Sequence, residues 1–483
     1  MKKQFHVRFA PSPTGYLHVG GLRTALYNYL FAKHNSGKFI LRIEDTDQSR
    51  RVEGAVENLI ETLKWSGIEY DEGPCRDGGC GPYVQSQRLE LYLKYAQELI
   101  SKEKAYYCFC TSKRLQEVRQ RQLAAKLSPS YDRLCRNISQ EEANKRIAAG
   151  EHYVIRMKVP IEGELSFDDV IRGKVTISYK MIDDQVLIKS DGFPTYHLAV
   201  VVDDHLMGIT HIIRGEEWLS SVPKHILLYQ YFGWEVPVLA HLPLLLNPDK
   251  SKLSKRQGDV AVEDYRAKGY LKEAIVNFIA FLGWNPGDER EIFSMEQLIE
   301  EFTLERVGKS GAVFNIEKLN WLNQQHIKLK SNEELAQLIK PHFQSIQQAD
   351  LDNSYFLKVI GLLKERLIFP KDFIDMSNYF FRDPEIFDEA GLKKYWEPET
   401  NGQLKILADR LESLLEFSQL SIETTLRQLA EELRIKPTKL IHPTRLALSG
   451  RTIGPGLFEM IEVLGKETVV RRLRHAVENF KAM

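Results

Sequence analysis

The sequence has few cysteines, no long apolar run and no excess of charge of one sign. Its five cysteines, in a chain of 483 residues, are too few and odd in number for a disulfide framework. The longest apolar stretches, residues 198–202 and 242–246, are far shorter than the ~20 residues that a membrane span needs. Residues 1–30 also lack the apolar core of a secretory signal. We therefore expect reduced thiols, no membrane segment and a cytoplasmic location.

Basic and acidic side chains number 66 each, so the overall charge gives no sign of a polyanionic partner. Apolar residues make up 43% and charged residues 27% of the chain, as in an ordinary globular protein. At ~150 residues per domain, the length predicts about three domains. Residues 434–475 carry nine basic and three acidic side chains. This local excess indicates either a solvated helical face or a face that binds a polyanion.

The first 43 residues have the pattern of a βαβ unit. Residues 5–9 alternate between apolar and polar, residues 22–30 have apolar side chains at helical spacing, and residues 39–43 form a short apolar run. Such a unit predicts an α/β fold with a parallel sheet, whose ligands bind at the carboxyl ends of its strands. Alternating patterns within residues 108–189 predict a mixed α+β insert, and helical periodicity dominates the C-terminal third.

The segment from Ala10 to Gly21, APSPTGYLHVGG, connects the first predicted strand to the first predicted helix. A turn in this place directs backbone N–H groups toward the ligand pocket, which suits phosphate binding. Gly20 and Gly21 allow a phosphate or base to approach the backbone, and His18 can donate to a phosphate oxygen. The glycine spacing fits neither a dinucleotide-binding fold nor a P-loop. Considered by itself, the segment could equally be a turn with a purely structural role.

A second motif, KSKLSKRQG, covers residues 250–258. Its cations flank a small hydroxyl residue in what the composition indicates is a loop. When a carboxylate attacks the α-phosphorus of ATP, two anions must meet, so preorganised cations lower the barrier. By itself, such a lysine-rich stretch is more typical of a solvated surface turn.

Together the two motifs resemble the paired signatures of class I aminoacyl-tRNA synthetases. Five further segments resemble glutamyl-tRNA synthetases of the bacterial or organellar type, namely residues 8–15, 42–47, 190–197, 202–205 and 214–218. The resemblance extends over nearly the whole chain. It implies ATP-dependent activation of L-glutamate to glutamyl-adenylate, with Mg²⁺, and transfer to the 3′-terminal adenosine of tRNA(Glu) with release of AMP.

The resemblance also assigns site residues. The catalytic residues would be His18, Lys252 and Lys255. ATP would be bound by Gly20, Gly21, Glu217, Trp218, Lys252, Ser254 and Lys255, and glutamate by Arg8, Ala10, Ser12, Glu44, Tyr196 and Arg214. In this assignment Arg8 and Arg214 receive the substrate carboxylates, and Glu44 holds the α-amino group.

Four residues near this site have a plainer alternative or depart from the family pattern. Arg42 and Asp47 could form a scaffold ion pair, and Trp218 could be a core residue. Val200 stands where some members of the family carry asparagine, so one polar contact to glutamate is missing or replaced.

Three of the cysteines have a spacing that resembles a zinc site of the family. Cys108 and Cys110 would lie on one face of a strand, and Cys135 follows 25 residues later. A structural zinc needs four ligands, and Asn137 stands where some relatives have the fourth, a histidine. We therefore expect no zinc, although Tyr131 or His152 could substitute. The other two cysteines, Cys75 and Cys80, match no partner pair.

The resemblance implies a domain order as well. Residues 1–92 and 196–249 would form a doubly wound, Rossmann-like catalytic domain, interrupted by an acceptor-end-binding insert at 93–195. Residues 250–330 would form a helical junction with the lysine-rich loop, and residues 331–483 a helical anticodon-binding region. In the last region, Arg366 matches a position that reads the last anticodon base in related enzymes.

We expect a monomer whose partners are ATP, L-glutamate and tRNA(Glu). Three alternatives remain. The enzyme could also charge tRNA(Gln), the chain could be a non-catalytic tRNA-binding paralogue, or it could be a small-molecule adenylating enzyme of the same superfamily. The motif residues His18, Gly20, Lys252 and Lys255 are all present, which argues against a non-catalytic paralogue.

Overall fold

The computed structural model describes residues 4–253, 261–344 and 352–480. The chain divides into two compact units. The first comprises Met1–Lys268 and Lys272–Leu319, and the second comprises Gly269–Leu271 and Asn320–Met483. Among the described helices, none is both long enough and apolar enough to cross a bilayer.

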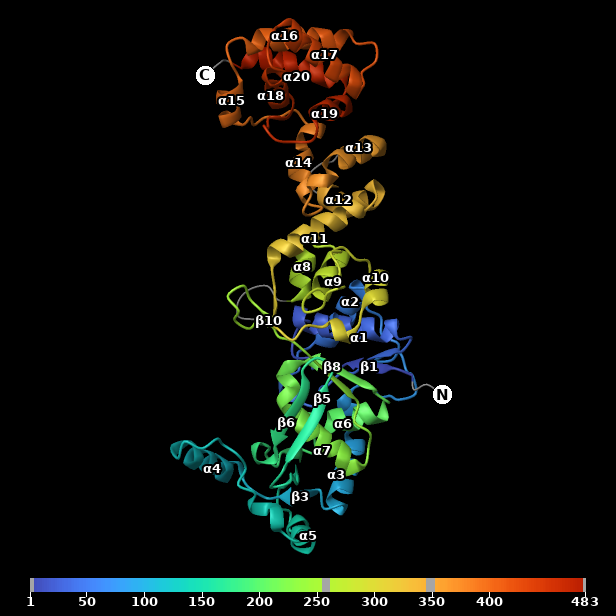
Figure 1. Cartoon of the computed structure of the whole chain (residues 1–483), viewed down its shortest axis with the longest axis vertical. Helices are drawn as coiled ribbons and strands as arrows, with labels where there is room; N and C mark the ends of the chain where they lie inside the picture. Colours follow the sequence, from blue (N-terminus) through green and yellow to red (C-terminus); the bar gives the residue numbers. More distant parts are fainter. Residues whose placement is uncertain (1–3, 254–260, 345–351, 481–483) are drawn as a thin grey trace. The chain divides into compact units, whose positions relative to one another are not determined.

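The first unit contains all the strands of the described chain (Figure 1). They are β1 (His6–Phe9), β2 (Lys38–Leu41), β3 (Ala105–Cys108), β4 (Val154–Met157), β5 (Glu164–Asp169), β6 (Gly173–Ser178), β7 (Val186–Ile188), β8 (His211–Gly215), β9 (Val238–Leu242), β10 (Leu245–Leu246) and β11 (Ala312–Val313). Strand β1 pairs with β2 in parallel, and β8 pairs with β9 in parallel. The backbone N–H of Thr210 donates to the His6 carbonyl at 2.9 Å, which connects β1 to the start of β8.

The helices of the first unit are α1 (Val19–His34), α2 (Ala55–Trp65), α3 (Leu89–Ser101), α4 (Ser112–Ala124), α5 (Gln140–Ala148), α6 (Tyr196–Leu206), α7 (Val222–Phe232), α8 (Val262–Lys268), α9 (Lys272–Ala280) and α10 (Met295–Glu301). Helix α1 packs against β1 on one side and against α9 and α10 on another (Figure 1). Ser294 and Gln297 cap the start of α10 through reciprocal hydrogen bonds, which form a capping box.

The predicted βαβ unit is confirmed as β1, α1 and β2. Val7 and Phe9 of β1 are buried, as is Phe39 of β2, and so are Leu22 and Leu26 of α1, the helix that packs against both strands. Burial of each such side chain contributes about 1.5–3 kcal/mol to folding. The carboxyl ends of β1 and β8 therefore lie on a rigid base, from which the following turns project.

The mixed α+β character predicted for residues 108–189 is also present. Strands β3, β4 and β7 form an antiparallel sheet, and β5 and β6 form an antiparallel pair. Strand β5 also pairs with β9 in parallel, through Asp169 and Leu239. This single pairing attaches the β5–β6 pair to the parallel sheet and brings Asp169 next to the strands that carry the cavity described below.

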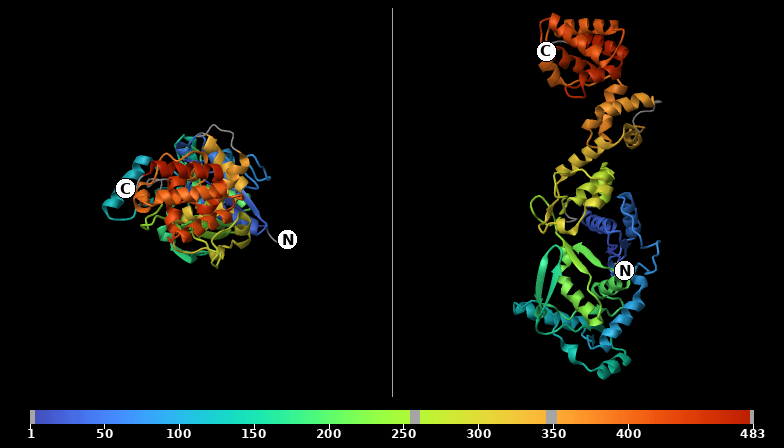
Figure 2. Two further views of the ribbon diagram at one scale, coloured as in Figure 1. Left: turned by 90° about the horizontal axis from the view of Figure 1, so that it is seen from above. Right: turned by 45° about the vertical axis from the view of Figure 1, so that its right-hand side comes forward.

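The second unit is built of helices throughout its described residues (Figure 2). With α11, in which the division between the units falls, they are α11 (Ile316–Leu329), α12 (Asn332–Gln344), α13 (Asn353–Leu363), α14 (Asp372–Phe381), α15 (Glu389–Tyr395), α16 (Thr400–Ser413), α17 (Gln419–Glu432), α18 (Thr438–Ser449), α19 (Leu457–Leu464) and α20 (Lys466–Asn479). Helix α19 ends at Gly465, whose φ of 81° lies in the region that favours glycine. The prediction of an α/β core with a parallel sheet, followed by a helical C-terminal part, is thus correct.

Candidate active site

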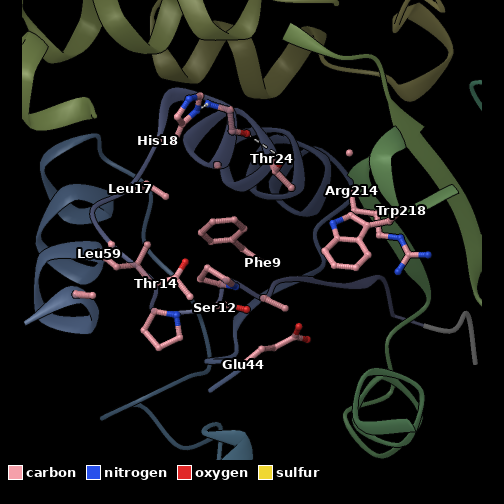
Figure 3. A pocket seen from close by; sticks show the side chains of 18 of the residues that line it. Phe9, Ser12, Thr14, Leu17, His18, Thr24, Glu44, Leu59, Arg214 and Trp218 are labelled. Atoms are coloured by element: carbon pink, nitrogen blue, oxygen red, sulfur yellow. Dashed lines mark hydrogen bonds between the residues drawn. The ribbon is translucent and has the colours of Figure 1, made fainter. Parts of the chain in front are cut away.

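A cavity of about 320 Å³ lies at the carboxyl ends of β1 and β8 (Figure 3). Most of the site residues assigned from the sequence line it: Arg8, Ala10, Ser12, His18, Gly20, Gly21, Glu44, Tyr196, Arg214, Glu217 and Trp218. They come from segments that are up to about two hundred residues apart in the chain. The fold therefore assembles a single concave site of the size that suits a small ligand.

His18 is the N-cap of α1 and fixes the turn after β1. Its Nδ1 accepts a hydrogen bond from the backbone N–H of Gly20 at 2.9 Å (Figure 3). A neutral ring that accepts at Nδ1 carries its proton on Nε2, which is the tautomer that can donate to a phosphate oxygen. A Cβ on Gly21 would lie 2.8 Å from Leu17 Cδ1, so the Leu17 side chain would have to shift to admit a larger residue there.

Only part of the lysine-rich loop can be placed. Lys252 is exposed, pairs with Leu246 in an isolated antiparallel bridge and is not among the residues that line the cavity. Ser254 and Lys255 lie outside the described residues. Where the described chain resumes, Ala261 forms an antiparallel bridge with His18, and Val262 N donates to the Leu17 carbonyl at 3.0 Å. The chain that follows the loop is thus anchored on the first turn.

On one side of the cavity, the lining residues Arg8 and Glu44 belong to a buried network of arginines and carboxylates. Arg8 donates to both oxygens of Asp204, at 2.9 and 3.2 Å. Arg42 donates to Asp204 at 2.8 Å and to Glu44 at 2.9 Å, and its Nε lies 3.8 Å from Asp203. We call these five residues the paired wall. The suggested pair of Arg42 with Asp47 is wrong, because Asp47 instead bonds the exposed Arg50 at 2.6 Å.

Electrostatics in the paired wall shift the pKa values of two of its carboxylates in opposite directions. Burial raises the pKa of Asp204, but the charges of Arg8 and Arg42 outweigh this effect and hold the pKa below its usual range. Burial raises the pKa of Glu44, and Arg42 only partly offsets it. Figure 3 shows the Glu44 carboxylate directed toward the cavity, where a ligand cation would lower this pKa again.

The other side of the cavity contains a buried arginine that is held by neutral groups. Arg214, in β8, donates from Nη1 to the Tyr196 hydroxyl at 2.8 Å and from Nε to His241 Nε2 at 3.1 Å. Its Nη2 lies 3.4 Å from His225 Nδ1. Within the described part of the chain, no carboxylate comes within 4.0 Å of this guanidinium group. We call Arg214, Tyr196, His225 and His241 the neutral wall.

Aromatic side chains complete the cavity. The rings of Tyr196 and Trp218 lie 4.3 Å apart at an angle of 36°. Trp218 is 38% exposed, so the alternative that it is a core residue is not correct. Val200, in contrast, is 2% exposed within α6 and offers no polar group to a ligand.

The cysteine cluster forms a second candidate site in the first unit. The sulfurs of Cys108, Cys110 and Cys135 all lie within 4.8 Å of one another. The Tyr131 hydroxyl lies 3.3 Å from Cys108 Sγ and 3.5 Å from Cys110 Sγ. Hydrogen bonds, first from Cys135 and then from Tyr131, hold the pKa of Cys108 well below its usual range, which favours the thiolate that binds metals. The cluster therefore offers three thiol ligands beside a phenol hydroxyl, one fewer than the four usual ligands of a structural zinc, and our expectation that no zinc binds here stays a prediction.

Arg366 lies in the second unit, where it lines a cavity of about 260 Å³ together with Arg451 and Pro455. Other cations of the basic segment are bound within the unit. Arg472 is 5% exposed and donates to Asp383 at 2.8 Å, and Arg471 pairs with the same carboxylate. Part of the positive charge in residues 434–475 therefore stabilises the helical unit itself.

Residues that hold the cavity arginines were given no role by the sequence analysis. Asp204, His225 and His241 belong to this group. One signal was available for the first: Asp203 and Asp204 follow a run of apolar residues within one helix, and carboxylates in such a buried position need cationic partners. The two histidines gave no signal of this kind, because an imidazole can be buried in its neutral form without a charged partner.

A parallel α/β core, a turn of the His18–Gly20–Gly21 type after its first strand, and a cavity with cationic and anionic groups define the catalytic domain of a class I aminoacyl-tRNA synthetase. Comparison with known proteins agrees. Residues 4–321 match the family described as tRNA synthetases class I (E and Q), catalytic domain, and residues 334–477 match an anticodon binding domain.

Curated relatives and solved structures narrow the family. The chain is 55% identical to the glutamate–tRNA ligase of Chloroherpeton thalassium, over 99% of this chain and 98% of that one. It is also 55% identical to that of Pelodictyon phaeoclathratiforme, over 98% and 97%. A crystal structure of a glutamate tRNA ligase from Elizabethkingia meningosepticum, in complex with its amino acid, matches with a TM-score of 0.93 and 42% identity, over 99% and 100% of the two chains. The chain therefore belongs to the glutamate–tRNA ligase family.

Proposed function

We propose that this chain activates L-glutamate with ATP to glutamyl-adenylate and transfers the glutamyl group to the 3′-terminal adenosine of tRNA(Glu). One observation carries the choice of amino acid. Arg214 is 5% exposed, lines the cavity and has no carboxylate partner within the described residues. A buried cation without a counterion needs an anionic ligand. Glutamate supplies a side-chain carboxylate for Arg214 and an ammonium group for Glu44.

The two chemical steps follow from this placement. A glutamate α-carboxylate oxygen attacks the α-phosphorus of ATP and pyrophosphate leaves; a ribose hydroxyl of the tRNA then attacks the glutamyl carbonyl carbon and AMP leaves. ATP enters as its Mg²⁺ complex, in which the metal reduces the charge of the phosphates. In the proposal Nε2–H of His18 donates to a phosphate oxygen, and Lys252 and Lys255 stabilise the charge that grows in the transition state. Anchoring of Ala261 on His18 supports a common site for the two motifs.

The remaining assignments complete the proposal. Gly20, Gly21, Glu217, Trp218 and Ser254 contact ATP. Arg8, Ala10, Ser12 and Tyr196 contact glutamate. The insert at 93–195 binds the acceptor end of the tRNA. The helical region at 331–483 binds the anticodon, and Arg366 contacts the last anticodon base. A monomer in the cytoplasm stays our prediction.

The test is parallel charging of purified tRNA(Glu) and tRNA(Gln) with labelled glutamate, together with ATP–pyrophosphate exchange in the presence of tRNA. We expect exchange and charging with glutamate. The tRNA(Gln) reaction decides whether the enzyme discriminates between the two tRNAs. Lys255→Ala serves as control, with turnover lowered far more than tRNA affinity. Failure of exchange with glutamate in the presence of its tRNA would overturn the proposal.

A further inference from the structure

A chain of buried hydrogen bonds extends from Arg214 to a carboxylate that the cavity does not expose. Arg214 Nε–H donates to His241 Nε2 at 3.1 Å, and His241 Nδ1 lies 2.6 Å from Asp169 Oδ2. His241 and Asp169 are 0% and 3% exposed. The pairing of β5 with β9 places Asp169 beside His241, so the insert supplies the end of this chain.

The hydrogen bonds fix the tautomer of His241. Arginine can only donate, so His241 Nε2 must accept and the proton must reside on Nδ1, which donates to Asp169. The other oxygen of Asp169, Oδ1, accepts backbone N–H groups of Ile171 at 3.0 Å, Arg172 at 2.9 Å and His241 at 3.2 Å. Three N–H donors on Oδ1 hold the carboxylate in this orientation. Asp169 therefore determines which nitrogen of His241 faces Arg214.

A second neutral histidine acts on the other edge of the guanidinium group. Arg214 Nη2 faces His225 Nδ1 at 3.4 Å, and His225 Nε2 faces His197 Nδ1 at 3.1 Å. The same reasoning puts the proton of His225 on Nε2, where it is donated to His197. With Tyr196 on Nη1, three of the five guanidinium N–H groups are occupied by neutral acceptors. Two N–H groups, one on each Nη, are left for a ligand in the cavity.

Neutral acceptors orient an arginine without cancelling its charge. A carboxylate in direct contact would orient Arg214 as Asp204 orients Arg8, but it would also compete with an anionic ligand for the same charge. An imidazole nitrogen accepts the hydrogen bond and carries no charge. The negative charge of Asp169 is kept on the far side of the His241 ring.

We infer that Asp169 and His241 are positioning residues that hold Arg214 charged and in one orientation, so that the cavity prefers a side-chain carboxylate to a carboxamide. This inference rests on the proposed function. A carboxylate offers two acceptor oxygens to the two remaining N–H groups, whereas a carboxamide offers one oxygen and presents an NH₂ group to the other donor. The preference requires that Arg214 does not rotate to accommodate the amide.

Asp169→Asn tests the inference most sharply because it changes hardly any volume. The three backbone donors keep the amide oxygen in the place of Oδ1, so the amide NH₂ faces His241 Nδ1 and forces the proton to Nε2. That proton then opposes the N–H of Arg214. We expect KM for glutamate to rise about 10- to 100-fold and the selectivity for glutamate over glutamine to fall at least tenfold, with KM for ATP within about twofold of wild type.

Substitutions of His241 provide the comparison. His241→Phe removes the acceptor and should reproduce the effect of Asp169→Asn, whereas His241→Gln keeps an acceptor oxygen and should restore most of the affinity for glutamate. His205→Phe is the matched control, because His205 is exposed and stacks on Trp234 at 3.7 Å, outside the cavity. Unchanged glutamate KM and selectivity in both Asp169→Asn and His241→Phe would overturn the inference, as would equal rises in KM for glutamate and ATP.

The tautomer of His241 can be measured directly, without an activity assay of any variant. Nitrogen-15 NMR of histidine-labelled wild-type enzyme should show His241 protonated on Nδ1 only, with Asp169→Asn moving the proton to Nε2. A wild-type ring protonated on Nε2, or on both nitrogens at neutral pH, would overturn the inference even if the variants fail to fold. Absence of glutamate charging by the wild type would instead refute the proposed function.

Discussion

The two walls of the cavity both bury arginines, but they compensate the charge in opposite ways. In the paired wall, Arg8 and Arg42 each bond a carboxylate at 2.9 Å or less. In the neutral wall, Arg214 bonds a hydroxyl and two imidazoles. A buried cation with its own carboxylate has its charge balanced within the fold, whereas one with neutral partners keeps its charge for a ligand. The paired wall therefore contributes to stability as well as to binding through Arg8 and Glu44, whereas we expect the neutral wall to contribute to binding.

The largest expected effect is on stability, from Asp204→Ala. This change leaves Arg8 and Arg42 buried without one of their carboxylates, and removal of one partner of a buried ion pair costs about 3–5 kcal/mol. We expect a loss of that size in the free energy of unfolding, measured by urea denaturation with tryptophan fluorescence. Asp409→Ala is the control, because Asp409 is an exposed partner of Arg474 at 3.1 Å and should cost at most about 1 kcal/mol. Equal losses in the two variants would show that the paired wall is not a stabilising unit.

Arg214→Met should have the opposite effect to Asp204→Ala: it should preserve stability and reduce activity with glutamate. It removes a buried cation that lacks a counterion, so the free energy of unfolding should stay the same or rise. It also removes charge-assisted hydrogen bonds to the substrate, worth about 1.5–3 kcal/mol each. We therefore expect kcat/KM for glutamate in ATP–pyrophosphate exchange to fall about 100-fold or more, with KM for ATP unchanged. A loss of stability like that of Asp204→Ala would abolish the distinction between the walls.

Sequence patterns predicted those parts of the molecule that depend on neighbours in the chain. The unit of β1, α1 and β2 follows from apolar spacing within 43 residues, and the helical second unit follows from the periodicity of the C-terminal third. Most cavity residues were assigned through the resemblance of their motifs, and the structure brings Arg8, Glu44 and Arg214 to one cavity.

The partners of those residues could not be predicted in the same way. Arg8 and Asp204 are 196 residues apart, and His241 and Asp169 are 72 residues apart. No periodicity connects positions at such separations, so only the folded chain shows which carboxylate compensates which arginine. The same reason accounts for the wrong pair of Arg42 with Asp47: closeness in sequence suggested a partner that the turn of the chain directs to solvent.

The histidines behind Arg214 should make the first unit sensitive to mild acid. Burial lowers the pKa of His197 to about 3, with further lowering by Lys224 and Arg214, and burial likewise holds the pKa of His225 well below its usual value. In the unfolded chain an imidazole binds its proton near pH 6.5, so below this pH the unfolded state binds more protons and stability falls as the pH falls. Each such histidine lowers the free energy of unfolding by at most about 1.4 kcal/mol for each unit by which the pH falls.

Unfolding measured between pH 6.5 and pH 5 should show this loss. His197→Gln keeps an acceptor for His225 and removes the titration, so we expect a shallower decline in the free energy of unfolding, by about 1 kcal/mol per pH unit. Carboxylates with lowered pKa, such as Asp383 at about 2 beside Arg471 and Arg472, lose their contribution only at lower pH. His34→Gln, at an exposed position of α1, should leave the slope as in wild type. A wild-type curve that is flat over this range would contradict the neutral state assigned to the wall.

The smallest effect should come from Tyr196→Phe. The phenyl ring keeps the contact with Trp218, whose ring lies 4.3 Å away, and only the hydroxyl that accepts from Arg214 at 2.8 Å is removed. Arg214 retains its hydrogen bonds to both histidines, so loss of this one bond should weaken the free energy of glutamate binding by about 1 kcal/mol and raise KM for glutamate roughly fivefold. The free energy of unfolding should be nearly unchanged. Tyr107→Phe is the matched control, because its hydroxyl bonds Gln97 at 3.0 Å, outside the cavity. An effect as large as that of Arg214→Met would mean that Tyr196, and not the pair of histidines, holds the guanidinium group in place.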